Sequence, residues 1–68
     1  MPKLPRDLSH DRLVRFLLSR GWMVVGGTRH TVLERDDVQL TVPRHTKLKT
    51  RTVAAILKQA GVADWSEL

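Results

Sequence analysis

The sequence has no cysteine and few aromatic side chains, with one Phe, two Trp and no Tyr in 68 residues. Without cysteine the chain forms no disulfide and offers neither a thiolate nucleophile nor a sulfur ligand for a metal. So few aromatics argue against a base-stacking platform for single-stranded nucleic acid. Trp22 and Trp65 are better explained as core residues.

Long apolar runs are also missing. The longest uncharged stretch, Gly21–Thr28, has eight residues, whereas a membrane-spanning helix needs about 20. The N-terminus (MPKLPRDLSHD) mixes charges with prolines and lacks an apolar run. These features predict a cytoplasmic protein that does not enter a membrane.

Positive charge, by contrast, is in excess. Twelve Lys and Arg against seven Asp and Glu give a formal net charge of +5 and a pI of about 10.8. A domain pI above about 9 favours an anionic partner, most often nucleic acid. A chain of 68 residues is long enough for one small domain, which we expect to span residues 1–68.

Periodicity predicts a first helix over residues 9–20, after an extended Met1–Leu8 segment. Apolar residues recur there at spacings of three and four, and Ser9 stands where an N-cap belongs. Gly21 is expected to end this helix.

A second helix is predicted from the apolar stripe of Val53, Ile56, Leu57 and Ala60. Thr50 is a plausible cap, and Gly61 followed by Val62 resembles a Schellman ending. Residues 63–68 are expected to add one turn that packs Trp65 on the core.

Three β-favouring segments lie between the helices, at Trp22–Val25, His30–Glu34 and Val38–Val42, with a turn at residues 36–37 and a stop at Pro43. Their connections are too short for parallel crossovers, which predicts an antiparallel meander. The fold class is therefore α+β in the order α-β-β-β-α. A three-stranded antiparallel sheet carries two helices on one face and leaves the other face exposed to water.

The strongest candidate for chemistry is His30, which follows a Gly26-Gly27-Thr28-Arg29 bend. Glycines let the backbone approach a ligand closely, while arginine and imidazole suit phosphate contact and proton transfer. RNA cleavage by 2′-hydroxyl attack needs a base active near neutral pH and donors for the phosphorane.

Simpler explanations exist for the same residues. A lone histidine is usually a surface or hydrogen-bonded residue, and His10 is most simply a solvated one. A Gly-Gly pair is more often an ordinary hairpin connection. Three dispersed histidines without cysteine or paired acids argue against a metal site, and no cofactor is expected.

The segment from Arg44 to Arg51 (RHTKLKTR) has four Lys or Arg residues and no acid. It could be a solvated helix face that keeps the protein soluble. Given the overall charge and Arg29, we favour phosphate contact instead. The predicted RNA-binding residues are Gly27, Thr28, Arg29, Arg44, His45, Lys47, Lys49 and Arg51.

Three segments together resemble the HicA toxin family (YcfA-like). These are the glycine bend with Thr28 and His30, the strand end Leu40–His45 (LTVPRH), and the helix Thr52–Val62 (TVAAILKQAGV). The likeness extends from about Leu8 to Trp65. The last two motifs at this spacing are specific, whereas the bend alone would be weak.

The resemblance implies a double-stranded-RNA-binding-domain-like fold and a metal-independent mRNA interferase, the toxin of a type II toxin–antitoxin system. It implies mRNA as substrate and a HicB-like antitoxin as the protein partner. The family's functional histidine matches His30, and His45 matches a second family histidine. Because Arg29 separates Thr28 from His30, aligning on the strand end could instead place Arg29 at the histidine position.

We therefore interpret the chain as an endoribonuclease toxin that acts in stress response, with His30 as general acid or base. His45, an arginine or water would share the second proton transfer. The antitoxin is expected to cover the wet sheet face and His30. The alternatives are a non-catalytic RNA-binding module of the same fold, and a toxin remnant or protein-interaction domain.

Overall fold

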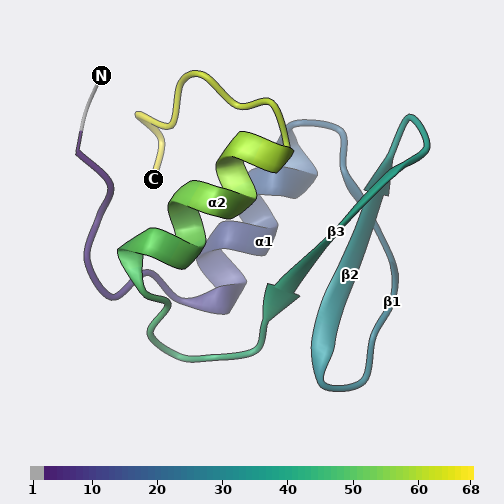
Figure 1. Cartoon of the computed structure of the whole chain (residues 1–68), viewed down its shortest axis with the longest axis horizontal. Coiled ribbons are helices and arrows are strands. Elements are labelled where there is room, and N and C mark those ends of the chain that lie inside the picture. Colours follow the sequence, from purple (N-terminus) through teal and green to yellow (C-terminus); the bar gives the residue numbers. More distant parts are fainter. Residues whose placement is uncertain (1–2) are drawn as a thin grey trace.

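The computed structural model describes residues 3–68 and contains two helices and three strands (Figure 1). In chain order they are α1 (His10–Ser19), β1 (Met23–Gly26), β2 (His30–Arg35), β3 (Val38–Pro43) and α2 (Thr50–Gln59). The predicted α-β-β-β-α order is confirmed, and each bound lies within a residue or two of the predicted one.

Both helices end in the Schellman arrangement that glycine allows. After α1, the Trp22 N–H donates to Leu17 O, and Gly21 adopts a φ of +92°. After α2, the Val62 N–H donates to Leu57 O, and Gly61 has a φ of +71°. The two predicted helix stops are confirmed, because each needs a left-handed residue that glycine supplies without strain.

The helix starts differ from each other. Ser9 caps α1 as predicted, since its Oγ accepts a hydrogen bond from the Arg12 N–H at 3.2 Å. The predicted Thr50 cap is wrong: Thr50 is already helical, and Lys49 occupies the cap position without a side-chain hydrogen bond. The first amides of α2 therefore lack a side-chain acceptor from their cap residue.

The sheet is an antiparallel meander in the order β1-β2-β3. Strands β2 and β3 pair without interruption from His30–Pro43 to Arg35–Val38. The two-residue turn between them has positive φ at both Asp36 and Asp37, +49° and +68°. A type I′ hairpin turn requires such angles, and aspartate tolerates them. This turn therefore sets the β2–β3 register.

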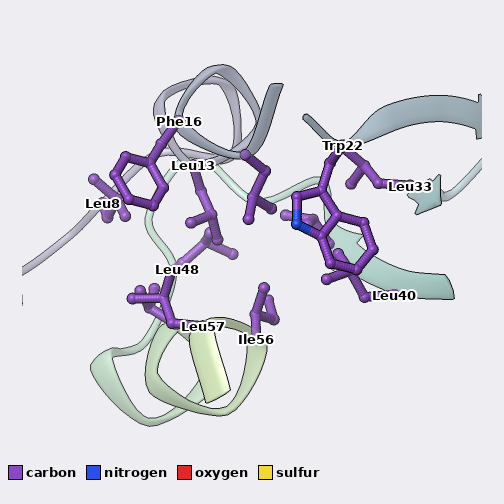
Figure 2. Packing of buried hydrophobic residues seen from close by; sticks show 12 residues of the cluster. Leu8, Leu13, Phe16, Trp22, Leu33, Leu40, Leu48, Ile56 and Leu57 are labelled. Carbon is purple, nitrogen blue, oxygen red and sulfur yellow. The ribbon is translucent and has the colours of Figure 1, made fainter. Parts of the chain in front are cut away.

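The core lies between the two helices and one face of the sheet. Twelve buried apolar residues form a single cluster, in which Trp22 lies against the sheet and Leu48 lies between Leu13 of α1 and Leu57 of α2 (Figure 2). Leu33 of β2 and Leu40 and Val42 of β3 supply the sheet's contribution. The members are Leu8, Leu13, Phe16, Leu17, Trp22, Leu33, Leu40, Val42, Leu48, Val53, Ile56 and Leu57.

The opposite face of the sheet carries no helix. Strand side chains alternate between the two faces, so the neighbours of the buried Thr31, Leu33, Leu40 and Val42 along each strand project to this side. They are His30, Val32 and Glu34 of β2 and Gln39, Thr41 and Pro43 of β3. We call this set the open face. Of its members, Val32, Glu34 and Pro43 are half-buried and the others are exposed.

The edge strand β1 is the least covered element. All four of its residues are exposed, including Met23 at 67% and Val25 at 51%, and its pairing with β2 is irregular between Val24 and Gly26. The predicted start of this strand shifts by one residue, because Trp22 packs in the core instead of pairing.

The two chain ends pack on this framework. Met1 and Pro2 of the predicted extended segment lie outside the described residues. Leu8 is buried and bridges Leu48, whose N–H donates to Leu8 O at 2.7 Å. At the other end a last turn joins Trp65 and Leu68, and Trp65 packs against the core as predicted. Leu68 packs there as well.

The same C-terminal segment contains a hydrogen-bonded carboxylate. The Ser66 N–H donates to the Asp64 carboxylate and lowers the pKa of Asp64.

Candidate functional site

His30 is the first residue of β2 and lies at one end of the open face. It is exposed, whereas the next residue, Thr31, is 3% exposed and faces the helices. Strand alternation therefore directs the His30 side chain away from the core. Its cross-strand partner is Pro43, the last residue of β3.

The glycine bend packs directly against the His30 backbone. Gly27 has a φ of +115°, a conformation that side-chain-bearing residues rarely adopt. A β-carbon at Gly27 would overlap the carbonyl oxygen of His30 and lie 3.1 Å from the Val32 nitrogen. At Gly26, by contrast, a β-carbon would meet nothing within 4 Å. Only the second glycine is thus required for the bend.

Two arginines flank His30. Arg29 lies in the bend, outside the strand, and is exposed. Arg44 follows β3, and its Nη2 donates to the Gly27 carbonyl oxygen at 3.4 Å. In the described part of the chain, neither guanidinium is in a salt bridge with a carboxylate. The end of the sheet thus carries an exposed imidazole with two guanidinium groups from adjacent segments.

A cavity lies beside this end, between the start of α1 and the segment after β3. It has a volume of about 290 Å³. His10 and His45 line it together with Arg44, and the remaining lining residues are Ser9, Asp11 and Thr46. Arg44 therefore belongs to both groups, while His45 joins the cavity and not the open face.

The interpretation of His10 as a solvated residue is wrong. Its side chain is only 17% exposed. The Nε2 atom lies 2.5 Å from Thr31 Oγ1, and Nδ1 lies 2.9 Å from Asp11 Oδ1. Its backbone N–H also donates to His45 O at 3.1 Å. Sequence reasoning missed this because residues 10 and 31 come together only in the tertiary structure.

The other basic residues predicted to bind RNA lie farther along the chain than Arg44. Lys47, Lys49 and Arg51 are all exposed, on the loop after β3 and the first turn of α2. Figure 1 shows this loop leaving the end of the sheet and crossing to the start of α2. Leu48 is buried between the two lysines and anchors the loop to Leu8. The structure thus extends the basic surface away from His30.

Within residues 3–68, no group of three or more His, Asp or Glu side chains is placed to hold a metal ion. In that part of the chain, neither helix is long and apolar enough to cross a membrane.

A family model described as the HicA toxin of bacterial toxin–antitoxin systems matches residues 11–62 of the 68. The chain belongs to the HicA toxin family. The match spans the fold from α1 to the Schellman turn after α2, so it includes His30, the glycine bend and the Arg44–Arg51 segment. This HicA-family chain is thus the toxin of a toxin–antitoxin pair. Comparison with curated proteins and with solved structures gave no match.

Proposed function

We propose that this HicA-family toxin is a metal-independent endoribonuclease that cleaves mRNA, with His30 as the proton-transfer group. The observation that carries the proposal is the exposed imidazole at the end of the open face. Arg29 directly precedes it, the Arg44 guanidinium contacts the Gly27 carbonyl of the same bend, and neither arginine is in a salt bridge in the described chain. An mRNA substrate implies action in the cytoplasm and a role in stress response.

The chemistry follows from these groups. His30 takes the proton of the ribose 2′-hydroxyl as the 2′ oxygen attacks the adjacent phosphorus. The P–O5′ bond then breaks, and the 5′ oxygen receives a proton. The products are a 2′,3′-cyclic phosphate and a 5′-hydroxyl. Arg29 and the Gly27–Thr28 amides would stabilise the charge on the phosphorane, as donors aimed at developing charge do.

The second proton transfer needs another group, and the structure favours the Arg44–His45 segment. His30 pairs with Pro43, so these two residues directly follow its cross-strand partner. Arg44 is tied to the glycine bend through the Gly27 carbonyl. His45 or a water molecule beside Arg44 would protonate the leaving 5′ oxygen.

We propose that the antitoxin binds the open face and β1. Met23, Val24 and Val25 are at least half exposed on an uncharged edge strand, next to the cationic end that carries Arg29 and Arg44. Apolar contacts to the edge with acidic contacts to the arginines would bury His30 and block RNA. A HicB-like protein is the proposed partner.

Digestion of RNA by the purified protein tests the proposed function. We expect cleavage in buffer containing EDTA, with 5′-hydroxyl and 2′,3′-cyclic phosphate ends identified by end-group analysis. Binding without cleavage would instead identify a non-catalytic RNA-binding module. Failure both to cleave RNA and to arrest growth on induction would point to a toxin remnant or protein-interaction domain.

Replacing Arg44 with glutamine should weaken RNA binding and reduce its salt dependence. Loss of one phosphate contact is expected to lower the slope of log K against log salt by about 1. Fluorescence anisotropy with a labelled RNA between low and physiological salt measures both effects.

The matched control is Lys58→Gln, an exposed cation on the last turn of α2. This variant should keep the wild-type slope. Equal slopes for Arg44→Gln and the wild type would show that Arg44 does not contact an RNA phosphate.

A further inference from the structure

His10 contacts the residue that directly follows His30 in the chain. Its Nε2 lies 2.5 Å from Thr31 Oγ1, and its Nδ1 lies 2.9 Å from Asp11 Oδ1. An ionised carboxylate only accepts hydrogen bonds, so the Nδ1–H of His10 donates to Asp11. The other ring nitrogen, Nε2, shares a hydrogen bond with the Thr31 hydroxyl, which can donate or accept. This chain of groups joins the start of α1 to the start of β2.

The contact accounts for a polar residue in the core. Thr31 is the buried polar residue found among residues 3–68, at 3% exposure, and its strand neighbours on that side are Leu33 and the paired Val42. Valine would pack equally well there, while an unpartnered buried hydroxyl is destabilising. The hydroxyl is satisfied because it hydrogen-bonds His10 Nε2.

The Thr31 side chain and the His30 side chain project to opposite faces of the same strand end. Thr31 faces the helices and His30 belongs to the open face. On the other side of His30, the Gly27 bend packs against its carbonyl group. The backbone of His30 is therefore held by Gly27 before it and by the Thr31 anchor after it.

We propose that His10 is a positioning residue that fixes the direction of His30 through Thr31. It does not contact the RNA at the scissile bond, because its Nε2 is engaged on the helix side of the sheet. Its backbone N–H, which donates to His45 O at 3.1 Å, also ties the segment after β3 to the same point. The expected loss of RNA cleavage rests on the proposed function, whereas the expected change in the position of His30 does not.

Kinetics of Thr31→Val, His10→Ala and the double variant test this role. Each single change should lower kcat for RNA cleavage by about 10- to 100-fold, since small displacements of a reacting group have effects of this size. The KM for RNA should stay near the wild-type value because the phosphate contacts are untouched. The double variant should be no slower than the slower single variant, since both changes remove one interaction.

A conservative variant and a control sharpen the result. His10→Gln should recover much of the rate, because its side-chain amide can still hydrogen-bond the Thr31 hydroxyl. Gln59→Ala, an exposed position at the end of α2, should behave as wild type. Independent, multiplying losses from His10→Ala and Thr31→Val would overturn the proposal, as would a rise in KM at constant kcat.

Amide NMR spectra provide a readout that does not need cleavage. Thr31→Val and His10→Ala should both shift the His30 and Gly27 amide signals, while the folded dispersion of the spectrum persists. If the wild type fails to cleave RNA, the proposed function falls, but these shifts still support the positioning role. Unchanged His30 signals in both variants would overturn it.

Discussion

The His30→Ala variant is expected to lose RNA cleavage by a factor of about 10² to 10⁴, the range for removal of a general acid or base. The imidazole is exposed and contributes nothing to the buried cluster. Folding should therefore be unchanged, and growth arrest on induction should disappear with the cleavage activity. Initial rates on a defined RNA, with circular dichroism of the same preparations, measure both.

Two companion variants decide which residue carries the chemistry. Arg29 lies in the bend and not in the strand, so Arg29→Ala should cost only about tenfold, as a lost phosphate donor does. If His45 protonates the leaving group, the loss of cleavage rate in His45→Ala should lie between the losses in Arg29→Ala and His30→Ala. A His30→Ala protein that cleaves at the wild-type rate would refute the assignment, and a larger loss from Arg29→Ala would transfer it to Arg29.

The Gly27→Ala variant should have the largest effect on stability at the site. A β-carbon would overlap the His30 carbonyl oxygen, and the φ of +115° is strained for alanine. We expect a loss of about 2–4 kcal/mol in the free energy of unfolding. That is a large part of the roughly 3–10 kcal/mol expected of a domain this size. The bend must also move, so cleavage should fall with stability.

The neighbouring glycine provides the matched control. A β-carbon at Gly26 meets nothing within 4 Å, and Gly26 is not among the residues with positive φ. Gly26→Ala should therefore change the free energy of unfolding by less than about 1 kcal/mol. Urea denaturation of the two variants measures the difference. Equal stabilities would mean that the bend does not require the Gly27 conformation.

The features predicted correctly from the sequence depend on neighbours within a few residues. Ser9 caps the helix that immediately follows it, and Gly21 and Gly61 end theirs, because each acts on amides or carbonyls one turn away. The alternation of residues 38–42 identified the buried and exposed sides of β3 in the same way. Such local rules were enough to predict the order of the elements.

The errors arise where the outcome depends on distant groups. Thr50 has the chemistry of a cap, but the preceding Lys49 takes the cap position as the chain leaves Leu48, which is buried against Leu8. His10 was interpreted as solvated because nothing within one turn of it indicates burial. Its partner, Thr31, is 21 positions away. No local pattern reports a contact across that separation.

The sequence by itself determined the helices, the hairpin turn, the basic character and the family, because each follows from residue type at short spacing. Only the tertiary structure decided how the parts of the site meet. Packing of the helices on one face of the sheet leaves His30 on the other face, joins Arg44 to the Gly27 carbonyl and places His10 behind Thr31. These contacts form only when burial of the shared core brings distant segments together.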